Sequence, residues 1–404
     1  MKKILWYTLV ALIFQSCDEI MPKAPAENEV LDGPIDGLSA AQTRTFIAGD
    51  EAFAEVFTPD TGLGPYFVIS SCIACHPGDG KGHPSSALVR FGRFDGGNFD
   101  HMLGMGGPQL QNRAIPGFEP ESIPVSATGI TTFLAPAVTG LGLLEAVSDS
   151  DLLANADPDD ADGDGISGVP NYITPPEFFT PGSYHTANNG RYIGRFGKKA
   201  GAIDLLMQTV GAYKQDMGIT SEFDSEDPIN YNEADIPISQ VDDPEVSTAT
   251  VNQVVFYLST LKPPVRRNQN DNQVQQGEML FEQIGCTSCH LPTLRTGDHA
   301  VEALANKVFH PYTDLLMHDM GPGLDDGYTE GTATTSEWKT PALWGLGLSP
   351  DAQGGNYFLL HDGRAGSIEE AIILHGGEAE QAATQFSVLS NQDKEFVIKF
   401  LESL

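Results

Sequence analysis

The chain has 404 residues, with 55 acidic and 22 basic side chains and a formal net charge of −33 at pH 7. A surface of this charge repels phosphate backbones, which argues against nucleic acid as a partner. The length allows two or three packed domains. The 43 glycines and 27 prolines favour short helices joined by long loops.

The first 17 residues have the features of an export signal. Lys2 and Lys3 precede an apolar run, residues 4–14, that is too short to span a bilayer but suits a signal peptide. Cys17 follows this run as in a bacterial lipobox. We therefore expect a lipoprotein of the periplasm or cell envelope, attached to a membrane by lipid on Cys17; cleavage by an ordinary signal peptidase is the alternative. The polar residues 18–37 would form a tether.

The first half of the chain begins and ends with an amphipathic segment. Phe46, Phe53 and Phe57 lie near helical spacing ahead of a motif at 72–76. Residues 250–261 place their apolar side chains on one helical face, and the prolines at 263 and 264 stop that helix.

The second half repeats this order. Residues 277–285 lead into a second motif at 286–290, and the C-terminal segment 391–404 has an apolar face that includes Phe396 and Phe400. Ser390 has the position of an N-cap, with Asp393 three residues later. The two halves look like one pattern used twice.

The two motifs are both C-x-x-C-H, CIACH at 72–76 and CTSCH at 286–290. At this spacing two thiols can form thioethers to haem vinyl groups while the next His reaches the iron. A zinc site would need further ligands, such as a second CxxC nearby, and neither motif has one. A redox dithiol or a disulfide is the other alternative. We expect two covalently bound haem c groups, attached through Cys72, Cys75, Cys286 and Cys289, with His76 and His290 as iron ligands.

A helix before CxxCH and an apolar helix that closes the domain are typical of a cytochrome c fold. The predicted fold class is therefore mostly α, with two cytochrome c-type helical domains, one haem in each, and long loops and insertions. We place the domains at 38–262 and 274–404 with a linker at 263–273. One insertion, DADGDGI at 160–166, matches the start of a calcium loop.

In that loop Asp160, Asp162 and Asp164 would bind calcium together with the carbonyl of Ile166, although Asn171 stands where a bidentate Glu is usual. A solvated acidic loop is the alternative, because the whole chain is acidic.

Beyond the motifs, several stretches resemble the bacterial di-haem cytochrome c peroxidase and MauG-like superfamily, in particular its peroxidase-like di-haem oxidoreductase branch, also called thiol oxidoreductases. The resemblance covers residues 45–404 and is carried by GLGPYFVISSCIACH (62–76), GPQLQNRAIPG (107–117), GLGLLEAV (140–147), NADPDDADGDGISG (155–168), GRFGKKA (194–200), HDMGPGL (318–324), WKTPALWGLGL (338–348) and HDGRAGSIEEAIILHGGEA (361–379).

The resemblance implies two unlike haems. The His76 haem would meet hydrogen peroxide at an open or openable site and be the catalytic one, while the second haem relays electrons from a small donor protein or a quinol-linked donor. The distal ligand of the second haem would be His375, where relatives carry Met or Tyr. His lowers the potential of a haem relative to Met. A surface His at a helix end is the alternative.

The resemblance also points to residues around the haems. Gln109 is the first candidate for a side chain over the first iron, as a second catalytic residue, while His83, His101, Met102 and Met105 remain open there. His361 and Arg364 of the HDGRAGS stretch would lie beside the second haem, where Arg could hold propionates; a plain turn is the alternative. Relatives that use a Trp relay differ, because here the relay would need Phe196, Tyr192 or Trp344.

The leading hypothesis is an exported haem-dependent oxidoreductase of peroxidase type. Two other functions stay open. A non-catalytic electron-transfer cytochrome would result if both irons had six ligands, and a MauG-like or oxygenase-like enzyme would oxidise an organic substrate or a protein.

Overall fold

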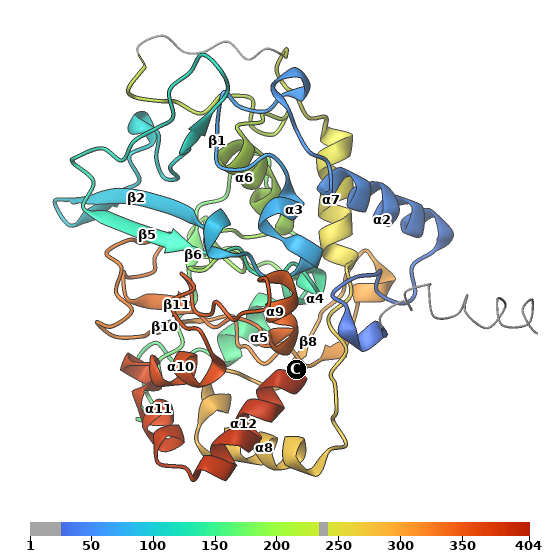
Figure 1. Ribbon diagram of the computed structural model, residues 1–404, viewed down its shortest axis with the longest axis vertical. Coiled ribbons are helices and arrows are strands. Elements are labelled where there is room, and N and C mark those ends of the chain that lie inside the picture. The colour runs from blue at the N-terminus through green and yellow to red at the C-terminus, as the bar shows by residue number, and fades with distance from the viewer. Residues whose placement is uncertain (1–25, 234–240) are drawn as a thin grey trace, which may run out of the picture.

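The computed structural model describes residues 26–233 and 241–404 (Figure 1). The predicted signal peptide, the lipidation site Cys17 and the first part of the tether lie outside these residues, so they stay predictions. Within the described ranges, no helix combines the length and the hydropathy that a bilayer span requires.

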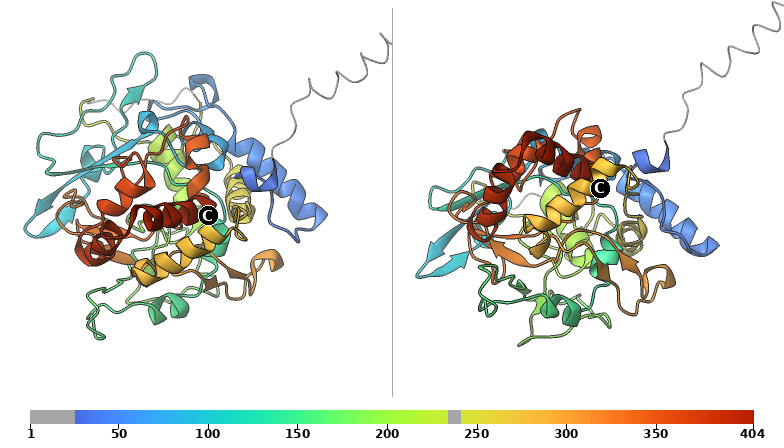
Figure 2. Two further views of the ribbon diagram at one scale, coloured as in Figure 1. Left: turned by 60° about the horizontal axis from the view of Figure 1, so that its bottom comes forward. Right: turned by 90° about the horizontal axis from the view of Figure 1, so that it is seen from below.

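Two pairs of long helices form the framework of the molecule. In the upper part α2 (Ala40–Phe53) packs against α7 (Thr248–Thr260), and at the bottom α8 (Asn272–Gln283) packs against α12 (Asn391–Ser403) (Figure 1). Both views of Figure 2 also place α8 and α12 side by side. The duplicated helix pair predicted from the sequence is therefore confirmed.

Each pair of helices crosses at a glycine. A Cβ on Gly49 of α2 would lie 2.1 Å from the carbonyl oxygen of Gln253 in α7, and a Cβ on Gly277 of α8 would lie 1.9 Å from that of Phe396 in α12. Neither glycine has a positive φ. Glycine is required here because two backbones approach closely, and not because of an unusual backbone conformation.

Both closing helices start with a serine N-cap, and for Ser390 the sequence predicts it. The Ser390 side chain accepts the Asp393 N–H at the start of α12, and Ser247 accepts the Thr250 N–H in the same way at α7. Such caps stabilise a helix by roughly 1 kcal/mol each. The buried faces are Val251, Val254, Tyr257 and Leu258 in α7, and Phe396, Val397, Phe400 and Leu401 in α12.

The remaining elements connect the two helix pairs, and apart from α6 the helices among them are short. The other helices are α3 (Cys72–Cys75), α4 (Leu141–Glu145), α5 (Asp149–Ala154), α6 (Leu205–Met217), α9 (Ser349–Ala352), α10 (Ile368–Ile373) and α11 (Glu380–Ser387). The strands are β1 (Tyr66–Phe67), β2 (Leu88–Asp95), β3 (Asn98–Asp100), β4 (Arg113–Ala114), β5 (Gly129–Phe133), β6 (Tyr172–Ile173), β7 (Tyr192–Ile193), β8 (Leu294–Arg295), β9 (Val308–Phe309), β10 (Met317–Asp319) and β11 (Glu337–Lys339).

The strands form small antiparallel sheets. The largest has the order β3-β2-β5, and the others are the pairs β1-β4, β6-β7, β8-β9 and β10-β11. The expectation of a mostly α fold is correct for the helix framework and wrong for the insertions, which contain these sheets. The strands were missed because most have only two or three residues, too few to show an alternating pattern.

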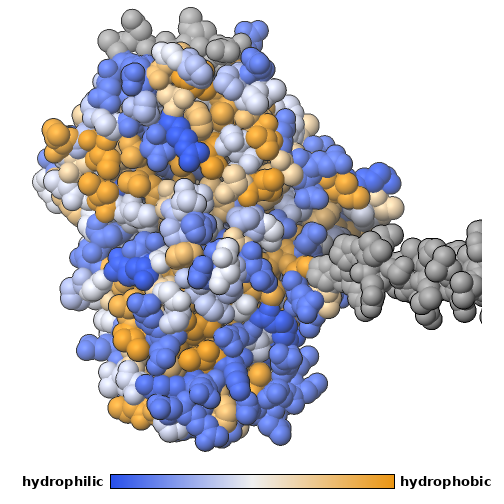
Figure 3. Space-filling view, viewed as in Figure 1, coloured by the Kyte–Doolittle hydropathy of each residue, from blue (hydrophilic) through white to orange (hydrophobic). Residues whose placement is uncertain are grey.

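The two halves share a core. One hydrophobic cluster joins Leu143, Leu144 and Leu152 of the first half to Phe309 and Trp344 of the second. The main chain also connects them, since the Leu134 N–H donates to the His361 carbonyl at 2.8 Å. On the face in Figure 3, hydrophilic residues predominate over the lower part of the molecule, where α8, α11 and α12 lie.

Candidate haem sites

The first C-x-x-C-H motif forms the short helix α3. Cys72 and Cys75 are both free thiols, and no disulfide occurs among the described cysteines. Burial raises the pKa of each thiol to about 12, so neither is a thiolate at neutral pH. The two thiols lie on one helical turn and are not joined to each other, which is the arrangement that thioether attachment uses.

His76 is fixed in one tautomer. Its Nδ1 donates to the Pro136 carbonyl at 2.8 Å, which leaves Nε2 as the ligand nitrogen. The ring lies 6.0 Å from that of Phe53 at the end of α2. His76 is only half-buried, yet desolvation lowers its pKa to about 4. The ring is therefore neutral at neutral pH and able to bind iron through Nε2.

The second motif repeats this geometry at Cys286–Ser288. Nδ1 of His290 donates to the Tyr312 carbonyl at 2.9 Å, and Phe281 of α8 takes the place of Phe53, with 6.2 Å between the ring centroids. Desolvation lowers the pKa of His290 to about 4, although this ring too is half-buried. The pattern used twice in the sequence is thus also used twice in the histidine sites.

His375 follows the C-terminal end of α10, as expected. Its Nδ1 donates to the Ala371 carbonyl at 2.7 Å, so Nε2 again remains for a metal. Its charge would act on His290, which places the two imidazoles in one region. Burial lowers the pKa of His375, which keeps the ring neutral and able to bind iron.

The residues present fit a haem at each motif. In the described chain, neither the thiols nor the histidines of the motifs belong to a group of three close metal-ligating atoms, as zinc would require. Cys72, Cys75 and His76 would hold one haem. Cys286, Cys289, His290 and His375 would hold the other.

Gln109 is completely buried near the first motif. Its amide donates to the Gln215 carbonyl at 2.9 Å and to Asp216 Oδ1 at 2.6 Å, at the end of α6. The Asp216 charge acts on both Cys72 and Cys75, so this group lies on the attachment side of the motif. Gln109 Oε1 is buried without a hydrogen bond in the structure.

Glu121 is a buried carboxyl that the sequence did not suggest. Its Oε2 accepts the Gln111 N–H at 2.7 Å, while Oε1 is buried and unpaired, like Oε1 of Gln111. The Gln111 amide donates to the Gln215 carbonyl at 3.0 Å, the group that Gln109 also contacts. Burial raises the pKa of Glu121 to about 8, so it holds a proton at neutral pH. Water or a small substrate could satisfy these unpaired oxygens.

The other candidates for the first iron have partners of their own. His83 Nδ1 accepts the Ser85 N–H at 3.1 Å, so its Nε2 carries the proton, the opposite tautomer to His76. His101 lies 3.4 Å from the Tyr328 hydroxyl. Met102 is buried, and Met105 is half-buried in the short turn that follows it. The structure assigns none of them to the iron.

The HDGRAGS stretch forms a turn in which Arg364 already has partners. Its Nε donates to Asp362 at 2.8 Å and its Nη1 to the Gly323 carbonyl at 3.0 Å, so its expected role with propionates stays a prediction. His361 is buried and stacks on Trp338 at 3.7 Å between ring centroids. Trp338 was not among the expected relay residues, because spacing gives no sign of this contact.

The acidic loop differs from the expected calcium site in one ligand. Asp157, Asp160 and Asp162 bring their oxygens to within 4.8 Å of one another. Asp164 is not in this group; its Oδ1 accepts the Ile166 N–H at 2.9 Å. Asp157, which lies before the DxDxDG pattern, takes its place. Calcium binding remains a prediction.

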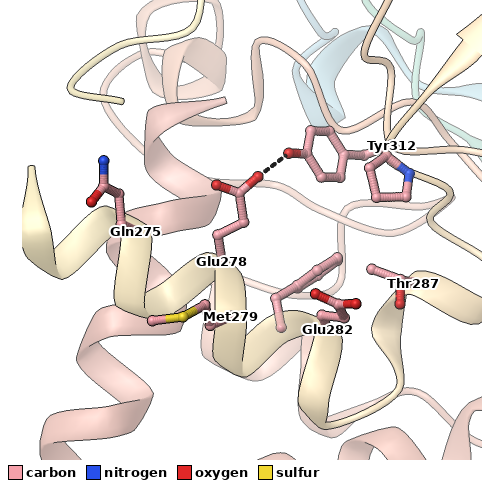
Figure 4. A pocket seen from close by; sticks show the side chains of 8 residues that line it. Gln275, Glu278, Met279, Glu282, Thr287 and Tyr312 are labelled. Carbon is pink, nitrogen blue, oxygen red and sulfur yellow. Dashed lines mark hydrogen bonds between the residues drawn. The ribbon is translucent and has the colours of Figure 1, made fainter. Parts of the chain in front are cut away.

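A shallow pocket of about 420 Å³ lies beside the second motif (Figure 4). It is lined by Glu278, Met279 and Glu282 of α8 and by Thr287, and Tyr312 donates to Glu278 across it. Neither His290 nor His375 lines this pocket, so it is not the space between those histidines.

Comparison with known proteins identifies the family. A sequence model described as "Di-haem oxidoreductase, putative peroxidase" matches residues 131–404, which include the second motif and His375. The chain belongs to this family of di-haem oxidoreductases.

No curated protein matches the chain. Among solved structures, hydrazine synthase of Kuenenia stuttgartiensis and a MauG-like protein associated with microbial copper homeostasis are similar. Each is 14% identical with a TM-score of 0.41 and covers 95% of this chain, and the chain covers 93% and 94% of theirs. A similarity this low carries no argument about function.

Proposed function

We propose that this di-haem oxidoreductase is an exported peroxidase that reduces hydrogen peroxide to water with electrons from an external donor. The proposed donor is a small basic protein or a quinol-linked carrier, since a net charge of −33 attracts a basic partner. Lipid on Cys17 would hold the enzyme at a membrane of the cell envelope.

The proposal is based on a difference between the site of His76 and the site of His290. His375 has a lowered pKa, its charge acts on His290, and its Nε2 would bind the second iron. At the first site the charge that acts on His76 comes from Lys198, and His83 accepts the Ser85 N–H through Nδ1. One closed and one open iron is the arrangement that a di-haem peroxidase needs, because a filled site cannot bind peroxide.

Haem bound at His76 would supply the iron that delivers electrons to the peroxide O–O bond. Reduction of hydrogen peroxide to two waters also consumes two protons. Glu121 holds a proton at neutral pH and is joined to Gln109 through Gln111 and the Gln215 carbonyl. We assign proton delivery to Glu121 and orientation of the peroxide substrate to Gln109.

The test uses the protein with both haems attached. In His76→Ala the haem stays bound through Cys72 and Cys75, so peroxide turnover should disappear while haem content is preserved. His310→Ala changes an exposed His with one contact to Thr293, and it should behave like the wild type. Full turnover in a haem-loaded His76→Ala would refute the assignment of the first haem as the reactive one.

A further inference from the structure

Three lysines come together where the two halves of the chain meet. Lys81 lies in the loop after the first motif, Lys198 in the turn before α6, and Lys339 at the end of β11. The Lys339 N–H donates to the Lys198 carbonyl at 3.1 Å, which fixes these two side by side. The charges of Lys81 and Lys339 both act on Lys198, so the three ammonium groups form one cluster.

The cluster lies between the two histidine sites. Next to Lys81, the Gly82 N–H donates to the Ala135 carbonyl at 2.9 Å, beside the Pro136 carbonyl that holds His76. The Lys198 charge acts on His76. Lys339 faces Asp314, whose charge also acts on His290. The lysines therefore connect the surroundings of one motif to those of the other.

None of the three lysine side chains forms an ion pair within the described ranges, in a protein that has more than twice as many acids as bases. The two carboxylates whose charges act on Lys198 and Lys339 already have other partners. Asp362 binds Arg364 at 2.8 Å, and Asp314 binds His318 Nε2 at 2.8 Å.

The three lysines are half-buried, yet protein surrounds them closely. Burial lowers the pKa of Lys198 to about 7, with the repulsion of Lys81 and Lys339 as further causes, and burial lowers the pKa of both Lys81 and Lys339 to about 8. Gathering like charges in such a place costs free energy unless anions join them. Asp362 and Asp314 offset this cost only in part, because within the described ranges neither forms an ion pair with these lysines.

We propose that Lys81, Lys198 and Lys339 bind the propionate carboxylates of the two haems and thereby raise the reduction potentials of both. The inference rests on the proposed haem attachment. Ammonium groups neutralise carboxylates through charge-assisted hydrogen bonds. An uncompensated propionate would favour the ferric over the ferrous iron, so each lysine raises the potential of the haem whose propionate it binds. The effect of each lysine on the reduction potential therefore depends on its positive charge.

The test is a spectroelectrochemical titration of the haem-loaded protein. Lys198→Met and Lys339→Met remove one charge each, and Lys307→Met removes the charge of an exposed lysine outside the cluster. We expect each cluster variant to shift the ferric-to-ferrous ratio of at least one haem roughly tenfold toward ferric, about 59 mV for a one-electron couple. Lys307→Met should leave both potentials unchanged. Unchanged potentials in both cluster variants would overturn the proposal.

Lys198→Arg is the control that distinguishes loss of charge from a change in structure. It keeps the charge, so it should keep the potentials that Lys198→Met loses; if it shifts them equally, the effect is not electrostatic and the proposal is wrong. In the wild type, an ammonium paired with a propionate should react slowly with an amine-acylating reagent at pH 8, and rapid acylation of Lys198 would contradict the pairing.

A haem assay separates this inference from the proposed function. If the wild type carries no covalent haem, both fail together. If both haems are attached and the cluster variants keep wild-type potentials, only the lysine assignment fails.

Discussion

Trp338 and His361 stack face to face, with ring centroids 3.7 Å apart and ring planes 10° from parallel. Lys199 Nζ lies 3.7 Å from the same indole centroid, and Trp338 Nε1 donates to the Leu324 carbonyl at 2.9 Å. The stack connects β11 to the turn that begins the HDGRAGS stretch. It is part of the contact between the strands and the C-terminal helices.

His361→Ala should therefore lower the free energy of unfolding by about 1–3 kcal/mol, because stacked aromatic pairs contribute about 0.5–1.5 kcal/mol beyond the area they bury. Urea unfolding of the haem-loaded protein measures this change. The exposed His310→Ala should stay within about 0.5 kcal/mol of the wild type. Equal effects of the two substitutions would show that the stack contributes nothing to stability.

Asp149 and Arg195 form a salt bridge in which neither side chain is exposed, with 2.6 Å between Oδ1 and Nη2. Asp149→Ala leaves the guanidinium buried with only carbonyl partners, so we expect a loss of about 3–5 kcal/mol. The matched control is Asp100→Ala, which breaks the exposed pair with Arg93 and should cost at most about 1 kcal/mol. Denaturant unfolding of the two variants tests the ranking, and similar losses would contradict it.

His318 should make stability depend on pH above neutrality. Burial alone would lower its pKa, but hydrogen bonds with Asp314, Cys289 and Glu378 outweigh burial and raise the pKa to about 12. The folded protein then keeps a proton that the unfolded chain releases near pH 6.5. The contribution of His318 is complete below that pH and decreases as the pH rises toward 12, by up to about 1.4 kcal/mol per unit.

Unfolding free energies measured between pH 7 and pH 9 should therefore decrease in the wild type more steeply than in His318→Gln, which has no proton to lose. The variant should also be less stable at pH 7, because Asp314 and Glu378 lose their charged partner. Parallel pH profiles for the two proteins would mean that His318 is neutral in the folded state.

His375→Met tests the second axial ligand. Met ligation raises the potential of a haem relative to His, so the second haem should become easier to reduce while the first is unchanged. Spectroelectrochemistry of the two haems provides the measurement. If His375→Met left both potentials and both spectra at their wild-type values, His375 would not be an iron ligand.

Glu121→Gln should slow peroxide turnover by roughly 100-fold or more, because general acid–base groups contribute about 10²–10⁴-fold. The wild-type rate should decrease as the pH rises through about 8, where the Glu121 carboxyl loses its proton. The variant, with an amide that does not titrate, should lack this decrease. Haem content serves as the control, and a variant with normal rates at pH 7 would remove Glu121 from the reaction.

Local patterns predicted much of the framework. The two C-x-x-C-H motifs, the closing helices and the position of His375 after α10 all follow from short-range spacing, and the structure has α10, α7 and α12 where they were expected. The sequence also suggested that the halves repeat one pattern. The matched pairs Phe53 with His76 and Phe281 with His290 extend that repeat to the sites themselves.

Long-range contacts could not be predicted in this way. The carbonyls of Pro136 and Tyr312 fix the two histidine tautomers from 60 and 22 residues away along the chain. Glu121 acquires its raised pKa only through burial by the fold. In the acidic loop the turn brings Asp157, which precedes the motif, close to Asp160 and Asp162. In each case the contact depends on how the chain folds back on itself, and the spacing of residues along the sequence does not contain that information.

Electron paramagnetic resonance of the haem-loaded protein tests the central claim most directly, in the fully oxidised state and after addition of one electron. The account predicts one low-spin haem, ligated by His290 and His375, and an open iron at His76, seen as a high-spin ferric signal in at least one of the two states. Two low-spin haems in both states would contradict it and would make this family member an electron-transfer protein.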